Sequence, residues 1–388
     1  MKTFKFTGSG FEYFKIWIVN ILLTIITLGI YYPWAKVRNN RYLYANSILE
    51  EKNFEYHATG KQLFFGYLIA VGLFILYKVL ENFFPIESII LLILFVIIIP
   101  WLIWRSMKFN LNVTSFNNVR FKFDGKLKKS YIIFLALPII FILIFGLIAF
   151  FIFQIKHITP LVIVGIISLI FFYMISFSYF NIMRTRYLID FTNYGNASFQ
   201  TNINTKEYLK IILKTILISI TTLIVTGVII AVIFYLMYGF TEFSSIISMY
   251  KTNPELVGIK IFTTFLPLII ISYFLTILVS IISLAYYITR QRKYIFSNTK
   301  LNDKIQFNST MKFIPYAFIL VSNFLLTLIT LGLAYPWAKV RIAKYTLNNT
   351  ALLMDGTFDG YFSENIKKES AIGEEIGDTL NVEIGMPF

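Results

Sequence analysis

The heptapeptide Tyr32-Pro33-Trp34-Ala35-Lys36-Val37-Arg38 returns near the other end of the chain as Tyr335-Pro336-Trp337-Ala338-Lys339-Val340-Arg341. Each copy closes a long apolar run, and the match continues upstream without a gap. The corresponding upstream residues are Asn20, Leu23, Thr24, Thr27 and Gly29 in the first copy and Asn323, Leu326, Thr327, Thr330 and Gly332 in the second. A match of this length is typical of a duplicated structural element. The sequence therefore predicts that both ends of the chain are built from one repeated module.

The composition indicates a membrane protein. The chain has 388 residues, of which 57% are hydrophobic, and its mean hydropathy is +0.71. A soluble domain contains about 45–50% apolar residues, and an apolar run of roughly 20 residues is long enough to cross about 30 Å of hydrocarbon. The predicted fold class is a polytopic α-helical integral membrane protein.

Eight apolar runs follow one another along the chain, and basic links alternate with weakly charged ones. The runs are 13–34, 63–80, 86–104, 131–153, 161–183, 211–238, 261–288 and 315–337. Because Lys and Arg concentrate in cytoplasmic loops, we expect the basic links, such as 105–129 and 290–312, to lie in the cytoplasm.

The basic links share a pattern of their own. A Lys or Arg precedes an aromatic residue, a Ser or Thr follows five residues after the aromatic residue, and a Phe follows about twelve residues after it. The five copies are Arg41-Tyr42, Ser47, Phe54; Lys108-Phe109, Thr114, Phe121; Arg186-Tyr187, Thr192, Phe199; Lys293-Tyr294, Thr299, Phe307; and Lys344-Tyr345, Thr350, Phe358. Alternation of apolar and polar residues bounded by Asn and Gly is typical of hairpins. The pattern predicts a short cytoplasmic β-hairpin repeated five times.

This prediction constrains the first and last apolar runs. If every strand and every basic motif is cytoplasmic, these two runs must leave the membrane on the side they entered. Each run then folds as two half-helices of about 11 residues, which reach roughly the bilayer midplane, and Thr24, Thr27 and Gly29 supply the bend. The prediction is six spans plus two re-entrant segments, with eight plain spans as the alternative.

Four regions follow from these patterns. Residues 1–60 form an N-terminal repeat module, 61–303 a central membrane region with basic hairpins, and 304–362 a C-terminal repeat module. Residues 363–388 form an acidic tail, which either docks weakly on the basic face or acts as an autoinhibitory plug.

The duplicated runs contain the first set of candidate residues. Asn20, Thr24 and Thr27 recur at helical spacing and form one polar stripe. Their counterparts are Asn323, Thr327 and Thr330. The structural interpretation is that these groups bond neighbouring helices, and the functional interpretation is that they line a polar path.

The heptapeptides contain the second set: Trp34, Lys36, Arg38, Trp337, Lys339 and Arg341. Aromatic and cationic residues at a membrane surface fix the depth of a helix. They also attract anionic lipid headgroups. Anionic lipids on the cytoplasmic side are therefore the predicted partners, and a cytoplasmic protein partner or an oligomer stays unassigned.

The sequence does not indicate an enzyme. It has no cysteine, two histidines, and no phosphate-binding glycine loop. We predict no catalytic residue, metal or cofactor. The net charge of +15 lies in the loops as the positive-inside rule requires, so nucleic acid is not a predicted partner.

The motifs Leu22-Leu23-Thr24-x-x-Thr27-Leu28-Gly29 and Tyr32 to Arg38, with the repeated basic units, resemble the YjgN-like family of bacterial membrane proteins. The tail sequence Ala371 to Ile376 is similar to that family as well. The resemblance covers essentially the whole chain and implies a multi-pass location in the bacterial inner membrane. It implies no activity.

Two functional hypotheses remain. The first is a transporter or channel-like protein for a small solute or lipid, with its path between helices. The second is a scaffold whose basic β cap binds a cytoplasmic partner or anionic lipid.

Overall fold

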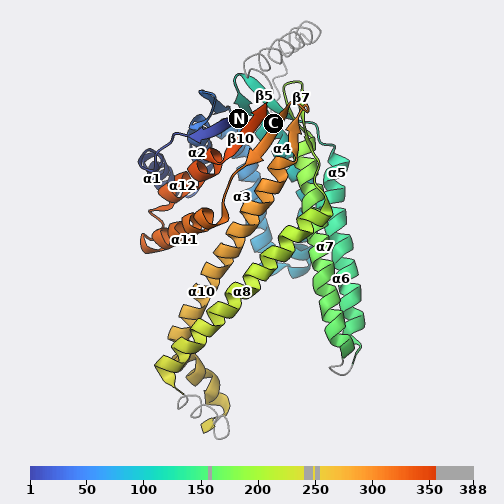
Figure 1. Ribbon diagram of the computed structural model, residues 1–388, viewed down its shortest axis with the longest axis vertical. Coiled ribbons are helices and arrows are strands. Elements are labelled where there is room, and N and C mark those ends of the chain that lie inside the picture. The colour runs from blue at the N-terminus through green and yellow to red at the C-terminus, as the bar shows by residue number, and fades with distance from the viewer. Residues whose placement is uncertain (156–159, 240–247, 250–253, 355–388) are drawn as a thin grey trace. The chain divides into compact units, whose positions relative to one another are not determined.

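The computed structural model describes residues 1–155, 160–239, 248–249 and 254–354 (Figure 1). The described helices are α1 (Gly10–Ile26), α2 (Tyr32–Ala45), α3 (Gly60–Phe83), α4 (Pro85–Asn112), α5 (Leu127–Tyr131), the π-helical turn η1 (Ile132–Ala136), α6 (Leu137–Phe153), α7 (Pro160–Asp190), α8 (Thr205–Tyr238), α10 (Pro254–Ser297), α11 (Phe313–Ile329) and α12 (Tyr335–Asn348). The described strands are β1 (Lys2–Phe6), β2 (Ser47–Leu49), β3 (Lys52–Tyr56), β4 (Thr114–Phe116), β5 (Val119–Phe123), β6 (Thr192–Tyr194), β7 (Ala197–Thr201), β8 (Thr299–Leu301), β9 (Ile305–Ser309) and β10 (Thr350–Met354).

The ten described strands form one closed antiparallel barrel in the order β1-β10-β9-β8-β7-β6-β5-β4-β3-β2. Figure 1 shows these strands gathered where α4 ends and where α7 returns from the far end of its hairpin with α6. Closure leaves the barrel without a free sheet edge. The short alternating strands that follow the basic motifs therefore belong to a single sheet.

The barrel is built from five similar strand pairs. In each pair, the third residue of the first strand lies opposite the first residue of the second. These partners are Leu49 and Lys52, Phe116 and Val119, Tyr194 and Ala197, Leu301 and Ile305, and Leu352 and Lys2. In the last pair, the second strand comes from the N-terminus, so β1 and β10 close the ring. The predicted strand at residues 358–360 and the acidic tail lie outside the described residues.

The interior of the barrel is apolar. One large side chain from every strand packs into a common cluster, because residues two apart in a strand face the same side. The third residues of the first strands are Leu49, Phe116, Tyr194, Leu301 and Leu352, and those of the second strands are Phe4, Phe54, Phe121, Phe199 and Phe307. The phenylalanine of the repeated sequence motif is therefore a barrel core residue in each of the four copies that the structure describes.

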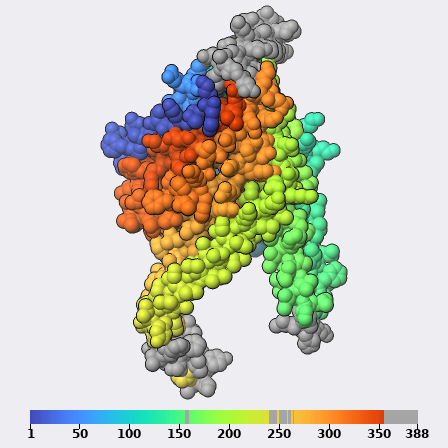
Figure 2. All heavy atoms as spheres, viewed as in Figure 1, coloured from blue at the N-terminus to red at the C-terminus, as the bar shows by residue number. Residues whose placement is uncertain are grey.

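The chain leaves the barrel after each second strand and returns at the next first strand through a pair of helical segments. The pairs are α1–α2, α3–α4, α5/η1/α6–α7, α8–α10 and α11–α12. The three middle pairs contain six helices that are long and apolar enough to cross a membrane. The polytopic helical fold class is thus confirmed. Figure 2 shows side chains of α6 and α7 exposed on the face of that pair that is turned toward the viewer.

The first and last apolar runs fold as helix, turn and helix. The expected symmetric split into two 11-residue halves is not what the structure shows: α1 and α11 each have 17 residues. The turn comes later, at Leu28 (φ 49°) and Gly29 (φ 92°), and again at Leu331 (φ 51°) and Gly332 (φ 93°). Pro33 and Pro336 lie in the first turns of the second helices, where proline is favoured.

The chain divides into two compact units. The first contains Met1–Leu209, Arg292–Met311 and the described residues from Leu333 onward, and therefore the whole barrel. The second contains Lys210–Gln291 and Lys312–Gly332, which cover most of α8 and α10 and all of α11.

Candidate functional site

The tryptophan of the first heptapeptide fixes α2 against the start of α3. The Trp34 indole lies against Gly60, where a Cβ would overlap the ring, and its centroid lies 5.2 Å from that of Phe64. One turn further, the ring of Tyr32 lies 5.5 Å from that of Tyr67. The glycine is thus required by the close approach of an aromatic ring.

The second heptapeptide repeats this contact at the other end of the chain. Trp337 lies against Gly10 and its ring centroid lies 5.0 Å from that of Phe14, while Tyr335 lies 6.1 Å from Trp17. The last helix of the first compact unit therefore packs on the first helix as α2 packs on α3. Each tryptophan thus packs against a glycine and a phenylalanine at the start of another helix.

The sequence contains a signal for this contact that the motif search missed. An aromatic residue occurs seven positions before the basic residue in all five copies: Trp34, Trp101, Tyr179, Tyr286 and Trp337. In the second compact unit, the ring of Tyr286 lies 5.4 Å from that of Phe313, the residue four positions after β9. The contact between this aromatic residue and the start of another helix is therefore present for Trp34, Tyr286 and Trp337.

Residues of the basic motif also form hydrogen bonds with the segments that join barrel strands to the helices after them. The Tyr42 hydroxyl accepts a hydrogen bond from the backbone N–H of Ser9 at 2.9 Å and lies 3.1 Å from a Glu12 carboxylate oxygen. The Arg41 guanidinium donates to the carbonyl of Ala58 at 2.9 Å, and Arg186 donates to the carbonyl of Ile203 in the same way. Burial, together with the hydrogen bond to Glu12, raises the pKa of the Tyr42 phenol, so this hydroxyl stays protonated at neutral pH.

The first set of predicted site residues lies at the α1–α2 pair. Asn20 is buried and donates from Nδ2 to Oδ1 of Asn39 at 3.0 Å, which links the two helices. The hydroxyls of Thr24 and Thr27 donate to carbonyls of their own helix, and Thr27 also accepts from the N–H of Tyr31 in the turn. The counterparts Asn323, Thr327 and Thr330 lie in the second compact unit.

The second set alternates along α2 and α12. Lys36, Arg38 and Lys339 are exposed, whereas Val37 and Val340 between them are buried. Arg341 is half-buried. The exposed cations are therefore available to solvent or to lipid headgroups.

A stripe of hydroxyls runs along α8 in the second compact unit. Thr215, Ser219 and Thr222 recur at positions i, i+4 and i+7, so at 100° per residue they share a sector of about 60°. All three are half-buried. They lie about 15–26 Å along the helix from its first residue, within a segment whose apolar window is only 6% buried.

A second stripe runs along α10 in the same compact unit. Its members are Ser272, Thr276, Ser280 and Ser283, which share a sector of about 80°. They lie about 21–38 Å from the last residue of α10, a range that overlaps that of the α8 stripe.

Near its start, α10 contacts α8 on the side that carries the α10 stripe, whereas the α8 stripe is turned about 90–130° away from the contacting residues Phe234 and Tyr238. Phe265 lies two helical turns before Ser272, on the same face. Its ring lies 5.5 Å from that of Phe234 and 5.1 Å from that of Tyr238, both on α8. These hydroxyl stripes were not singled out from the sequence, although their spacing is visible in it.

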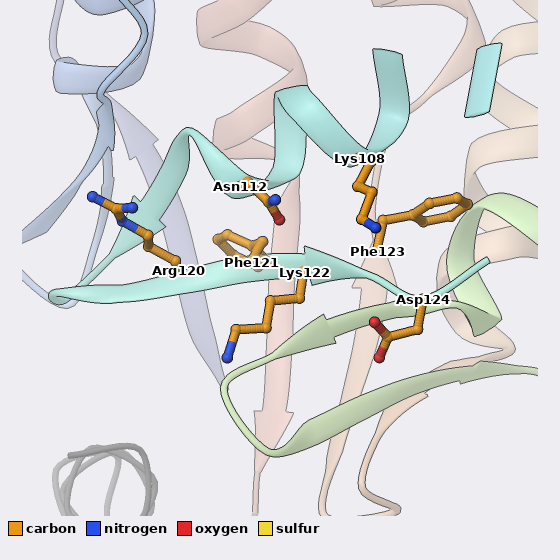
Figure 3. A pocket seen from close by; sticks show the side chains of 7 residues that line it. All are labelled: Lys108, Asn112, Arg120, Phe121, Lys122, Phe123 and Asp124. Atoms are coloured by element: carbon orange, nitrogen blue, oxygen red, sulfur yellow. The ribbon is translucent and has the colours of Figure 1, made fainter. Parts of the chain in front are cut away.

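A basic pocket lies where α4 ends on the barrel. Figure 3 shows Lys108 and Asn112 pointing from the last turns of α4 toward β5. The cavity has a volume of about 300 Å³, and Arg120, Phe121, Lys122, Phe123 and Asp124 complete its lining. Asp124 accepts a hydrogen bond from Asn193 at 2.5 Å. Three cations and one carboxylate give this pocket a net positive charge.

Comparison with known proteins assigns the chain to a family. The profile described as "Bacterial protein of unknown function (DUF898)" matches residues 1–379. The chain belongs to the DUF898 family. Among its DUF898 relatives is the "Inner membrane protein YjgN" of Salmonella typhimurium, which is 28% identical over 91% of this chain and 89% of the relative. The proteins of the same name from Escherichia coli O157:H7 and Escherichia coli K12 are 28% and 27% identical over the same shares. No solved structure matches.

The resemblance predicted from the sequence motifs is thereby confirmed. Together with the six apolar helices, the relatives establish this DUF898 member as a multi-pass protein of the bacterial inner membrane.

Proposed function

We propose that this protein moves phospholipids between the two leaflets of the inner membrane, along the hydroxyl stripes of α8 and α10. The observation that carries the proposal is that two apolar helices each carry a hydroxyl stripe, at overlapping distances from their barrel ends. A headgroup crossing the hydrocarbon core needs polar contacts, and side-chain hydroxyls provide them without the cost of placing charges in the bilayer. The acyl chains meanwhile stay in contact with the exposed apolar faces of the spans.

Lipid is favoured over a small solute for two reasons. The barrel interior is filled by an apolar cluster, which offers no aqueous path through the barrel. The apolar windows of the spans are between 0% and 17% buried, so most of their surface is open to lipid rather than packed around a water-filled channel.

The proposal includes a topology for the terminal pairs. In the α1–α2 and α11–α12 pairs, the turn leucines are almost fully exposed: Leu28 by 93% and Leu331 by 94%. A helix of 17 residues is about 26 Å long, shorter than the roughly 30 Å hydrocarbon core. We place both turns inside the cytoplasmic leaflet and the barrel in the cytoplasm, which gives six spans plus two re-entrant pairs.

The test is lipid flux in reconstituted vesicles. Vesicles carry phospholipids with a fluorescent acyl chain, and dithionite added outside bleaches only the outer leaflet unless lipids cross. We expect the protein to carry labelled lipids from the inner to the outer leaflet, so that dithionite bleaches their fluorescence as well. The triple variant Thr215→Val, Ser219→Ala, Thr222→Val should slow crossing by about twentyfold, at roughly 0.6 kcal/mol for each of the three lost hydrogen bonds.

The matched control is Thr221→Val, which removes a hydroxyl from another face of α8. Thr221 donates to the carbonyl of Leu217 at 2.8 Å like its neighbours, so helix stability changes equally per substitution. Equal flux in the triple variant and in Thr221→Val would remove the stripe as the path, and bleaching identical to that of empty vesicles would reject lipid movement altogether.

A second candidate function is binding of anionic lipid or a cytoplasmic partner by the basic rim of the barrel. The positively charged pocket beneath α4 and the exposed Lys36 and Lys339 favour it. Each such cation contributes roughly 1 kcal/mol of attraction to an acidic leaflet. If the rim binds acidic lipid, Lys36→Ala with Lys339→Ala will lower the amount that co-purifies, while the flux of zwitterionic lipid stays unchanged.

A further inference from the structure

Six of the seven hydroxyls of the two stripes are committed as donors. Thr215, Ser219 and Thr222 donate to the carbonyls of Ile211, Thr215 and Ile218 at 2.8, 3.0 and 2.7 Å. On α10, Ser272, Thr276 and Ser280 donate to the carbonyls of Ile269, Ser272 and Thr276 at 2.8, 2.8 and 2.9 Å. Six hydroxyl protons thus point into the backbone of their own helices.

A hydroxyl that has donated its proton still has lone pairs. Each of these six oxygens can accept one further hydrogen bond but has no proton left to donate. The side chains are half-buried or exposed, so a molecule beside the helices can reach them. Each stripe therefore presents a row of acceptors along its own helix.

We infer that these rows select phospholipids whose headgroups carry hydrogen-bond donors, such as the ammonium of an ethanolamine headgroup. This inference rests on the proposed function and specifies its substrate. A choline headgroup has the same charge but no N–H, so it crosses the stripe without forming these bonds. Burying an oxygen beside a group that cannot donate costs free energy, and the difference appears as a difference in crossing rate.

Ser283 differs from the other stripe residues. Its side chain is 8% exposed, and its Oγ has no hydrogen-bond partner among the described residues. It lies on the same face of α10, within the sector of the other three. A buried hydroxyl with an uncommitted proton is rare in proteins. We assign Ser283 to the lipid phosphate, whose oxygens accept hydrogen bonds and which every phospholipid carries. Because this oxygen is buried, the phosphate reaches it only when α10 shifts relative to the side chains that cover it.

The two assignments predict different signatures in the same vesicles. Four lipids with one fluorescent acyl chain are compared: the ethanolamine lipid, its N-methyl and N,N-dimethyl forms, and the choline lipid. This series removes one donor at a time at constant charge. We expect the crossing rate to fall along the series, by about threefold for each hydrogen bond lost.

The variants separate the two roles. The triple variant Thr215→Val, Ser219→Ala, Thr222→Val should lower the ratio of the ethanolamine to the choline rate toward one. Ser283→Ala should slow all four lipids by a similar factor and leave that ratio unchanged. Ser168→Ala, which removes an α7 hydroxyl that donates to the carbonyl of Gly165, should change neither quantity.

The outcomes distinguish this inference from the proposed function. If all four lipids cross at one rate, or if choline crosses fastest, the donor preference is wrong and lipid movement stands. A ratio that falls in Ser283→Ala as well would overturn the phosphate assignment. If none of the four lipids crosses, both the function and this preference are rejected.

Discussion

Replacing Gly60 with alanine is expected to destabilise the protein by about 1–3 kcal/mol. The new Cβ would overlap the indole of Trp34, and that ring is held in turn by Phe64 at 5.2 Å. The ring must move, which separates α2 from α3. Gly10→Ala should have the same effect on the contact between α1 and Trp337. The measurement is the midpoint of thermal unfolding in detergent.

Two controls identify the cause. Gly66→Ala lies in the same helix, and its Cβ would meet nothing within 4 Å, so we expect a stabilisation of about 0.5–1 kcal/mol from helix propensity. In a Trp34→Ala background, Gly60→Ala should lower the stability much less than in the natural chain, because the indole that the new Cβ would overlap is absent. A similar loss in both backgrounds would show that the tryptophan is not the reason for the glycine.

Replacing Phe54 with alanine is expected to lower the free energy of unfolding by about 3–5 kcal/mol. Part of the population is then expected not to close the barrel. The Phe54 ring lies 4.6 Å from that of Phe116, 6.2 Å from Phe4 and 6.5 Å from Phe121. Its removal therefore opens a cavity among four strands. Loss of the unfolding transition or of monodisperse protein in detergent reports this effect.

The matched comparison is Asn53→Ala, the preceding residue of β3, which is exposed and should change stability by less than about 0.5 kcal/mol. Phe54→Leu keeps most of the volume and should cost less than about 1.5 kcal/mol, so it remains measurable if the alanine variant does not fold. A protein that tolerates Phe54→Ala as well as Asn53→Ala does not have the packed barrel described above.

Local patterns predicted much of the fold. Alternation at Phe54, Phe121, Phe199 and Phe307 predicted strands after the basic motifs, because the period of a strand is legible over a few residues. Apolar length identified eight runs, and six of them contain the helices that are long and apolar enough to cross a membrane. The pairing of β1 with β10 could not be found in this way, because nothing local in Lys2–Phe6 identifies a partner at the opposite end of the chain.

The sites were harder to predict than the elements. Trp34 and Trp337 were predicted to lie at the membrane interface, and their packing on Gly60 and Gly10 could not be predicted because it depends on which helices are neighbours. Hydroxyl stripes occur in many membrane helices, so the spacing of Thr215, Ser219 and Thr222 becomes informative only when α10 carries a stripe at an overlapping distance from its barrel end. Gly29 lies in the turn as predicted, whereas Thr24 lies inside α1, which continues to Ile26.

The central claim is that all five helical pairs start and end at one barrel on one side of the membrane. Because the chain has no cysteine, single variants carry one thiol each. The measurement is labelling of Leu28→Cys, Leu331→Cys, Asn118→Cys in the β4–β5 turn and Phe84→Cys between α3 and α4, with an impermeant maleimide added to intact spheroplasts or to inverted vesicles. We predict that only Phe84→Cys reacts in spheroplasts, that Asn118→Cys reacts in inverted vesicles, and that the two leucine positions react in neither. Labelling of Leu28→Cys or Leu331→Cys from the periplasmic side would contradict the account.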